Sequence, residues 1–191
     1  MIDFKNVKKI VVNKLSQLNS NLTYHCPEHT LDVLEQSIRI AKDEKIGDER
    51  DLYLLKIAAL YHDTGFLQTY VAHELKSCEI FLKDANDFDL TTQEKSIITN
   101  LIMATQIPQL PTTLLEKIIC DADLDYLGRD DFFSIGDNLR KEFLCYKIVA
   151  NNEEWENMQL KFLQHHHYHT GSSQKLREPA KQLHFSRLQT S

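Results

Sequence analysis

Residues 57–66, IAALYHDTGF, place a histidine and an aspartate at the end of the most apolar helical segment of the chain. His62 and Asp63 are out of place there, because a buried polar side chain is costly unless it is hydrogen-bonded or binds something. Gly65 follows at a position where helices often end with a glycine. The segment therefore predicts a buried helix that ends in a polar pair able to act as ligands.

Apolar residues recur at helical spacing on both sides of this segment, and no run alternates for long enough to indicate a strand. Helix start signals accompany them: Pro27 suits a first turn, Asp48 an N-cap, and Thr91 with Glu94 a capping box. Five glycines and four prolines are too few for many tight hairpins. We therefore expect an all-α fold with helices over about residues 4–18, 27–44, 48–61, 71–84, 91–105, 112–123, 130–150, 152–168 and 173–189.

The length of 191 residues suits one domain, and no linker or internal repeat divides the chain. We expect a single helical domain over residues 1–191. Its core spans about residues 24–130, and a C-terminal helical extension spans about residues 151–191.

The net charge is −6, which argues against extended nucleic-acid binding because phosphate backbones attract basic surfaces. Lysines interrupt the apolar run in MIDFKNVKKIVVNK, which is not typical of a secretory signal. The longest uncharged stretch, residues 96–115, contains two prolines and polar amides, so we expect no membrane association. The four cysteines lack a CxxC pair, which indicates reduced thiols and a cytoplasmic location.

Two further clusters contain side chains that bind metals. The stretch YHCPEH at residues 24–29 puts His25 and His29 four residues apart, on one face of a helix start. The stretch CDADLD at residues 120–125 ends an apolar helix with three carboxylates, which a packed interior would not accept without a cation. Together with the first pair, these clusters offer two imidazoles and two carboxylates, from His29, His62, Asp63 and Asp123. The alternative interpretation is a buried hydrogen-bonded network without metal.

This ligand mixture suits one divalent metal ion, such as Mn, Fe, Co, Ni or Mg. Four protein ligands on an octahedral ion leave two positions for water and a substrate oxygen. Such an ion lowers the pKa of a bound water molecule and polarises a phosphoryl oxygen, which supports metal-assisted hydrolysis. Asp63 is placed either to orient the attacking water or to bridge to a second ion.

The order His, His-Asp, Asp, with AALYHDTGF around the pair and CDADLDYLG around the last aspartate, resembles the HD-domain metal-dependent phosphohydrolases over about residues 24–130. The resemblance implies an all-α bundle of five or more helices around the site, here with additional C-terminal helices. In that family the first histidine, the HD pair and the last aspartate hold the metal. By motif position these are His29, His62, Asp63 and Asp123. We prefer Asp123 to Asp121 because the family's last ligand usually follows a small residue.

The segment YHCPEHTLDV is similar, more narrowly, to the YHN-x-x-H-x-x-DV segment of cyclic-nucleotide phosphodiesterases, although Cys26 replaces the asparagine. The first histidine of that segment is a general acid, which implies that His25 protonates the leaving oxygen. HD proteins with two metals carry further histidines between the HD pair and the last aspartate, whereas only His73 lies in that interval here. We therefore expect one ion. The nucleotidase branch of the HD family often has a glutamate shortly after the HD pair. Residues 64–66 supply no glutamate, so this feature of the nucleotidases is missing here.

Three more side chains are candidates for binding a substrate phosphate. His73 and Lys76 lie on the helix predicted after the HD pair, and Arg129 follows the last acidic cluster. The alternative for Arg129 is an ion pair with Asp130 or Asp131.

Two other groups of polar residues have structural interpretations. Asp121 and Asp125 share a helix face, and we expect them to hydrogen-bond near the ligands or to pair with a basic residue at a helix end. The run HHHYH at residues 165–169 is expected to be a partly exposed helix end with one buried member.

The sequence thus predicts a hydrolase that cleaves a phosphate mono- or diester of a small metabolite or nucleotide with metal-activated water. Asp63 would orient the water, and His25 would protonate the leaving group. The expected partner is a small phosphorylated substrate, and a homo-oligomer is an open alternative. Two other functions also stay open: a hydratase or di-iron oxygenase on the same scaffold, and a non-catalytic module that senses a nucleotide.

Overall fold

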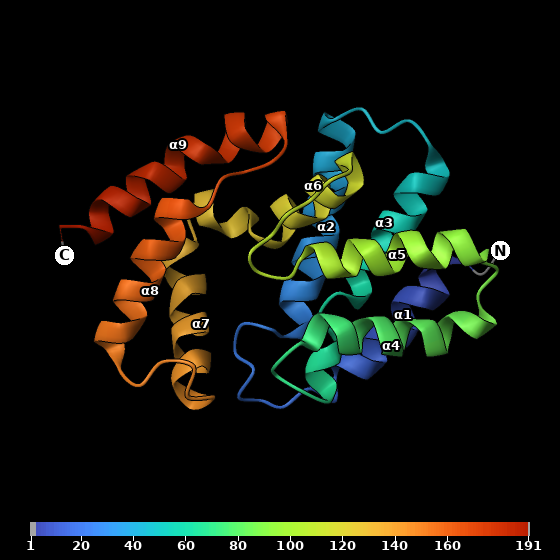
Figure 1. Cartoon of the computed structure of the whole chain (residues 1–191), viewed down its shortest axis with the longest axis horizontal. Coiled ribbons are helices and arrows are strands. Elements are labelled where there is room, and N and C mark those ends of the chain that lie inside the picture. The colour runs from blue at the N-terminus through green and yellow to red at the C-terminus, as the bar shows by residue number, and fades with distance from the viewer. Residues whose placement is uncertain (1–2, 191) are drawn as a thin grey trace.

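Helices form all the regular structure of residues 3–190, which are the residues that the computed structural model describes (Figure 1). No strand occurs in this range, and the predicted all-α fold is confirmed. The elements are α1 (Phe4–Leu15), α2 (Pro27–Asp43), α3 (Glu49–Tyr61), η1 (Thr64–Leu67), α4 (His73–Asp84), η2 (Ala85–Asp87), α5 (Thr92–Ala104), α6 (Leu114–Asp123), η3 (Asp125–Gly128), α7 (Phe132–Cys145), α8 (Asn152–His165) and α9 (Gly171–Leu188). Across residues 3–190, none of these helices has the length and apolarity needed to cross a bilayer.

Local start signals position the helices as the sequence indicates. Asp48 caps α3 by accepting hydrogen bonds from two backbone N–H groups of the first turn. Thr91 and Glu94 form the predicted capping box at the start of α5. A second capping box, of Thr113 and Glu116, begins α6. These caps satisfy backbone donors that a helix start otherwise leaves without partners.

Three helices, α1, α7 and α8, end earlier than the apolar spacing predicts, and α8 ends at His165 because the backbone of His166 is extended. α1 ends at Leu15, after which the N–H of Leu18 donates to the carbonyl of Leu15 (3.0 Å) in a tighter turn. Leu18 still packs against the core, so the apolar pattern continues beyond the helix. α7 ends at Cys145, because Lys147 has a φ of 58° that a right-handed helix cannot accommodate.

Gly65 does not end α3, as the sequence suggested, but allows two backbone segments to touch. It lies in η1, and its φ is not positive. A Cβ atom there would lie 1.9 Å from the carbonyl oxygen of His73 and 2.9 Å from the backbone nitrogen of Ser77. The Ser77 hydroxyl accepts from the N–H of Gly65 (2.8 Å) and donates to the carbonyl of His62 (2.6 Å). The glycine therefore sets how closely α4 approaches the HD pair.

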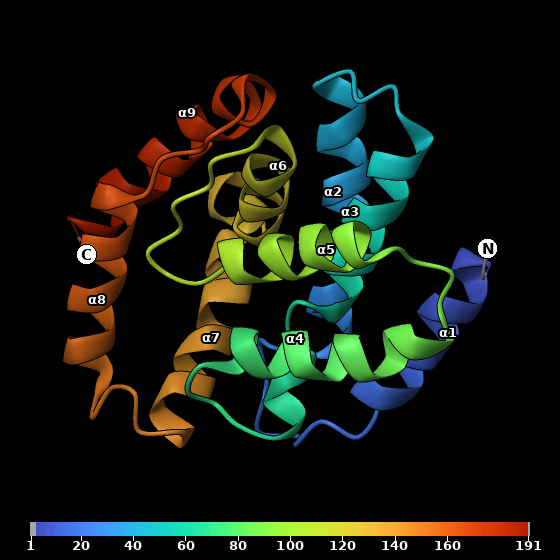
Figure 2. The same ribbon diagram turned by 45° about the vertical axis from the view of Figure 1, so that its right-hand side comes forward.

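Two apolar cores lie next to each other in the molecule (Figures 1 and 2). The larger core is built by α1 to α6 around α3, which has eight buried residues among its thirteen. The smaller core joins η3, α7 and α8 with Tyr24 and Tyr168, and Phe185 of α9 packs against it. In Figure 1, α2 and α6 lie on the side of the larger group that faces α7, α8 and α9.

A buried carboxylate fastens the C-terminal helices to the core. Asp125 in η3 is fully buried and pairs with Arg39 of α2 (2.6 Å) and Arg177 of α9 (2.9 Å). A Cβ atom on Gly128 would lie 2.3 Å from the carbonyl oxygen of Arg177, so η3 and α9 are in backbone contact. Residues 1–2 and 191, the ends of the predicted domain, lie outside the described residues.

We expect Gly65→Ala to lower the free energy of unfolding by roughly 1–3 kcal/mol, the usual cost of overpacking, because the atoms it meets are backbone. Gly47→Ala is the matched control, since a Cβ atom there meets nothing within 4 Å. The control should change that free energy by less than about 0.5 kcal/mol. Denaturant titration followed by circular dichroism measures both, and equal stability of the two variants would contradict the close contact.

Candidate metal centre

The four predicted ligands come from three helix ends that meet between the two cores. His29 is in the first turn of α2, which begins at Pro27. His62 is the C-cap of α3, and Asp63 follows it. Asp123 is the last residue of α6. Because α2 packs against both α3 and α6, it brings these distant parts of the sequence together.

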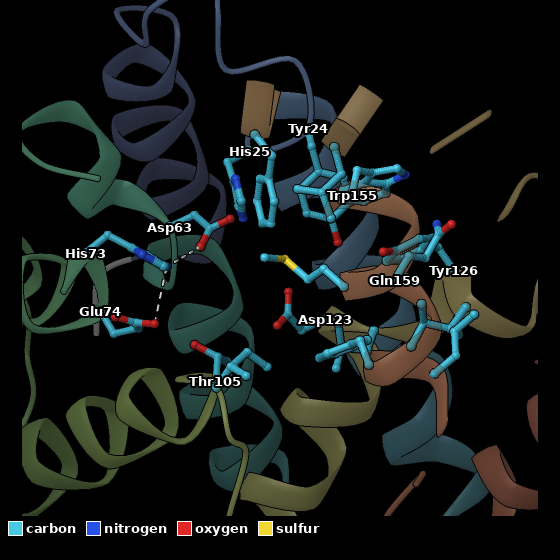
Figure 3. Close-up of a pocket in the computed structure, with 18 residues that line it drawn as sticks. Tyr24, His25, Asp63, His73, Glu74, Thr105, Asp123, Tyr126, Trp155 and Gln159 are labelled. Atoms are coloured by element: carbon cyan, nitrogen blue, oxygen red, sulfur yellow. Dashed lines mark ion pairs between the residues drawn. The ribbon is translucent and has the colours of Figure 1, made fainter. Parts of the chain in front are cut away.

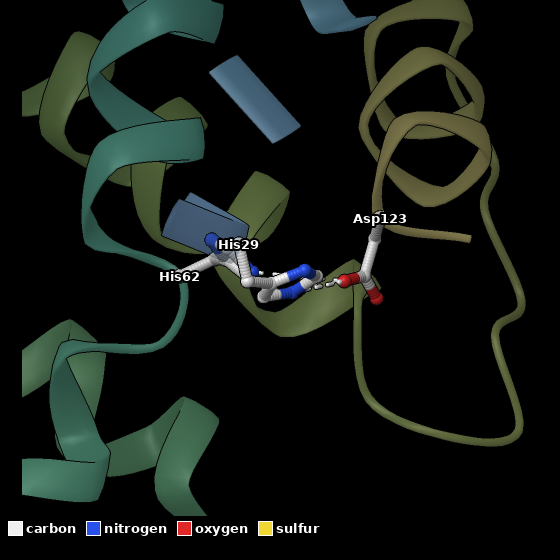
Figure 4. Close-up of side chains that lie close together, drawn as sticks. All are labelled: His29, His62 and Asp123. Carbon is white, nitrogen blue, oxygen red and sulfur yellow. Dashed lines mark ion pairs between the residues drawn. The ribbon is translucent and has the colours of Figure 1, made fainter. Parts of the chain in front are cut away.

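The ligand atoms of His29, His62 and Asp123 all lie within 4.8 Å of one another (Figure 4). The Oδ1 atom of Asp123 is 3.2 Å from Nε2 of His29 and 3.6 Å from Nε2 of His62. The Oδ2 atom of Asp63 is 3.4 Å and 3.2 Å from the same two nitrogens. Ligands at about 2.1 Å from one ion are roughly 3 Å apart, so the spacings within the trio suit a shared cation, whereas Asp63 lies beside the trio without belonging to it.

The hydrogen bonding of these atoms also fits a cation. The Nε2 atoms of His29 and His62 and the Oδ2 atom of Asp63 are buried and have no hydrogen-bond partner. The Nδ1 atom of His62 lies 2.8 Å from the carbonyl oxygen of Ala59, which can only accept a hydrogen bond. This bond places the proton on Nδ1 and leaves a lone pair on Nε2, the arrangement that a metal ligand requires.

Both carboxylates of the centre favour the ionised form. Burial by itself raises the pKa of Asp123, but the adjacent imidazoles of His29 and His62 outweigh it and lower that pKa to about 2. Burial also acts to raise the pKa of Asp63, but the adjacent imidazole of His62 holds that pKa well below its ordinary value. The centre therefore presents two negative groups to a cation.

Two cavities reach the centre from different sides. One has a volume of about 370 Å³ and is lined by Asp63, Asp123, His25 and His73 among others (Figure 3). The other has a volume of about 210 Å³ and is lined by His29 and Asp123. The centre is therefore accessible to molecules larger than water.

His25 belongs to the site, and its partner is a residue that the sequence analysis missed. Its Nδ1 atom pairs with Oε1 of Glu142, a fully buried residue of α7. The other oxygen of Glu142 accepts from the backbone N–H groups of Tyr24 (2.9 Å) and His25 (3.1 Å). Burial alone would lower the pKa of His25, but the hydrogen bond with Glu142 and the charge of Asp63 raise it above its ordinary value. His25 is thus fixed in orientation and favoured in its protonated form.

His73 faces the cavity together with a second residue that the analysis missed, Glu74. The Nε2 atom of His73 is 3.4 Å from Oδ1 of Asp63 and 3.6 Å from Oε1 of Glu74. Glu74 is buried and also lines the cavity. Asp63 therefore turns one oxygen toward the metal ligands and the other toward His73. A role of His73 in binding a phosphate stays a prediction.

The sequence contains a signal for both missed carboxylates, because each occupies a position on an apolar helix stripe. Glu142 follows Ile135 and Leu139 of α7 at intervals of seven and three residues. Glu74 precedes the buried Cys78 and Phe81 of α4 at intervals of four and seven residues. A carboxylate at such a position is forced toward the interior, where it needs a partner.

Lys76 and Arg129 are engaged by acidic residues. The structure does not bring Lys76 to the large cavity, because its ammonium group pairs with Glu79 of the same helix. Arg129 lines the smaller cavity, and its guanidinium makes the predicted ion pair with Asp131 (2.8 Å) as well as one with Asp32 (2.7 Å).

The remaining polar clusters have structural roles. Asp121 accepts hydrogen bonds from the backbone N–H groups of His169 and Thr170, both at 2.8 Å, at the start of α9. In the histidine run His166 is buried, as expected of one member, and Lys181 donates to its carbonyl. Within residues 3–190, the run forms no cluster of three close ligand atoms like that of the metal centre.

The comparisons with known proteins give one match. The family model of the HD domain matches residues 28–125, about half of the chain, and this segment contains His29, His62, Asp63 and Asp123. Domains of this superfamily bind divalent metals, and most are metal-dependent hydrolases. No curated protein and no solved structure shows significant similarity to the chain. His25 and Glu142 lie outside the matched segment.

We expect the protein to bind one Mn²⁺ or Co²⁺ ion per chain, and His62→Ala to weaken that binding by about 100-fold or more, since even residues behind the ligands contribute about 10–100-fold. His167→Ala, which removes an exposed histidine outside the centre, should bind the ion like the unaltered protein. Titration calorimetry with the metal-free proteins, supported by elemental analysis, measures both. Full binding by His62→Ala, or loss of the ion in His167→Ala, would contradict the assignment.

Proposed function

Because the chain belongs to the HD-domain family, we propose that it is a metal-dependent hydrolase that cleaves a phosphate ester of a small molecule. The observation that carries this proposal is the trio of closely spaced ligand atoms from His29, His62 and Asp123, of which Asp123 lines the large cavity. Imidazole and carboxylate ligands together favour Mn, Fe, Co, Ni or Mg over metals that prefer thiolates.

A divalent cation bound there would lower the pKa of a water molecule and stabilise negative charge on a phosphoryl oxygen. Asp63 is the carboxylate next to both the trio and the cavity. In this proposal Asp63 accepts a hydrogen bond from the attacking water and fixes its direction of approach.

His25 acts as the general acid in this proposal. The water oxygen bonds to phosphorus, the ester P–O bond breaks, and the departing oxygen takes a proton from His25 to leave as an alcohol. Since Nδ1 of His25 is engaged by Glu142, the proton comes from Nε2. The proton that the water releases returns His25 to its protonated form through solvent. Glu142 is a positioning residue, because it holds the imidazole and favours its charged state.

We expect the protein to hydrolyse phosphomonoesters or phosphodiesters only when Mn²⁺, Co²⁺, Ni²⁺ or Mg²⁺ is present, with activity lost on chelation and restored on reloading. A phosphatase and phosphodiesterase panel followed by phosphate or alcohol release tests this. Consumption of oxygen by a protein with two bound irons, hydration of a nitrile, or a bound nucleotide that stays unchanged with metal would each contradict the proposal.

We expect His25→Gln to lower kcat by roughly 10²–10⁴-fold, the usual contribution of a general acid, with the bound metal retained. Glu142→Gln should lower kcat in the same direction with little change in KM. Asp137→Asn, which removes a half-exposed carboxylate from the same helix, is the matched control and should leave kcat unchanged. Steady-state kinetics and metal content measure these effects, and an unaltered kcat in His25→Gln would remove His25 from the reaction.

A further inference from the structure

The large cavity has two unlike walls. Figure 3 shows His73, Glu74 and Asp63 on one side and Trp155 and Gln159 on the other, with Asp123 between them. The wall opposite the polar side is formed by apolar side chains of α7 and α8, which include Leu139, Phe143, Trp155, Met158, Phe162 and Leu163. A ligand that reaches Asp123 therefore meets polar groups at one end and an apolar surface at the other.

The charges of this cavity limit what can occupy it. Among the described residues that line it, none is a lysine or an arginine, whereas Asp63, Glu74 and Asp123 are acidic. A phosphoryl group at the metal centre would be neutralised by the cation. A second phosphate or a carboxylate further along the cavity would be desolvated beside acidic groups, with no lysine or arginine to pair with and with His25 already paired with Glu142. The cavity thus disfavours ligands with several anionic groups.

The size of the cavity suits a substantial apolar group. A cavity of roughly 150 Å³ is enough to enclose a benzene ring. The volume of about 370 Å³ therefore accommodates a phosphoryl group together with a ring or a chain of several carbons. Met158 is 38% exposed, so an apolar ligand would remove accessible apolar surface from water. In contrast, the hydroxyl groups of a sugar placed on this wall would find few hydrogen-bond partners, apart from the amide of Gln159 and the tyrosine hydroxyls of Tyr24 and Tyr126.

We propose that the substrate is a phosphate ester of an uncharged apolar alcohol, whose aryl or alkyl group lies against Phe143, Trp155 and Met158. The inference rests on the proposed hydrolase function and names its substrate class. All three side chains lie beyond residue 125, where the match to the HD-domain model ends. The C-terminal helices of this chain therefore supply the specificity, and the HD segment supplies the metal ligands.

The test uses binding, so it does not depend on turnover. Trp155 is the only tryptophan of the chain, and its emission reports on this wall. With the metal-loaded protein, we expect hexylphosphonate and benzylphosphonate to shift the emission of Trp155 at concentrations at least ten-fold below those needed for methylphosphonate. Met158→Glu, which puts a charge on the wall at a partly exposed position, should reduce this preference at least ten-fold. Leu183→Glu is the matched control, because Leu183 is 61% exposed on α9 and does not line the cavity.

Kinetics separate the two proposals. If the apolar phosphonates bind preferentially and no phosphoester is hydrolysed, the hydrolase proposal fails and the apolar subsite stands. If phosphoesters are hydrolysed, we expect kcat/KM for hexyl phosphate to exceed that for methyl phosphate and for ADP at least ten-fold. Equal affinity for hexylphosphonate and methylphosphonate, or a preference for ADP, would overturn the inference. The ligand series with the unaltered protein keeps the test decisive even if Met158→Glu does not fold.

Discussion

The Nε2 atoms of His29 and His62 lie buried beside the carboxylates of Asp63 and Asp123 without making a hydrogen bond to them. An unsatisfied buried polar group costs about 1–3 kcal/mol, and several such groups together would be difficult for a marginally stable domain to tolerate. A cation among them would turn this cost into a favourable interaction. The start of α2 and the end of α6 contribute one of these groups each, and the end of α3 contributes two.

The centre lies where the two cores meet, so each core contributes different parts of the site. The helices of the larger core carry the metal ligands at the start of α2 and at the ends of α3 and α6. The C-terminal helices bring the carboxylate of Glu142, which orients His25, and the apolar wall around Trp155. Since Asp125 of η3 pairs with Arg39 of α2 as well as with Arg177 of α9, the second group of helices is fastened to the first.

Features that depend on neighbours in the sequence could be predicted, and features that depend on long-range packing could not. The cap at Asp48 and the capping box at Thr91 are local, so the helix starts followed from the sequence. The pair His62 and Asp63 was conspicuous because it ends an apolar helix. Glu142 lies 117 residues from His25, and nothing near either residue announces their contact. The role of Gly65 was also missed, because the space it leaves is filled by the backbone of α4.

We infer that the start of α2 and the ends of α3 and α6 enclose a single cation. The most direct measurement is an anomalous difference map from a crystal of the manganese-loaded protein, recorded at a wavelength where manganese scatters anomalously. We expect one strong peak among Nε2 of His29, Nε2 of His62 and the carboxylate of Asp123, with Asp63 next to it. A map with no peak there, or with its only peak at the histidines of residues 165–169, would contradict it.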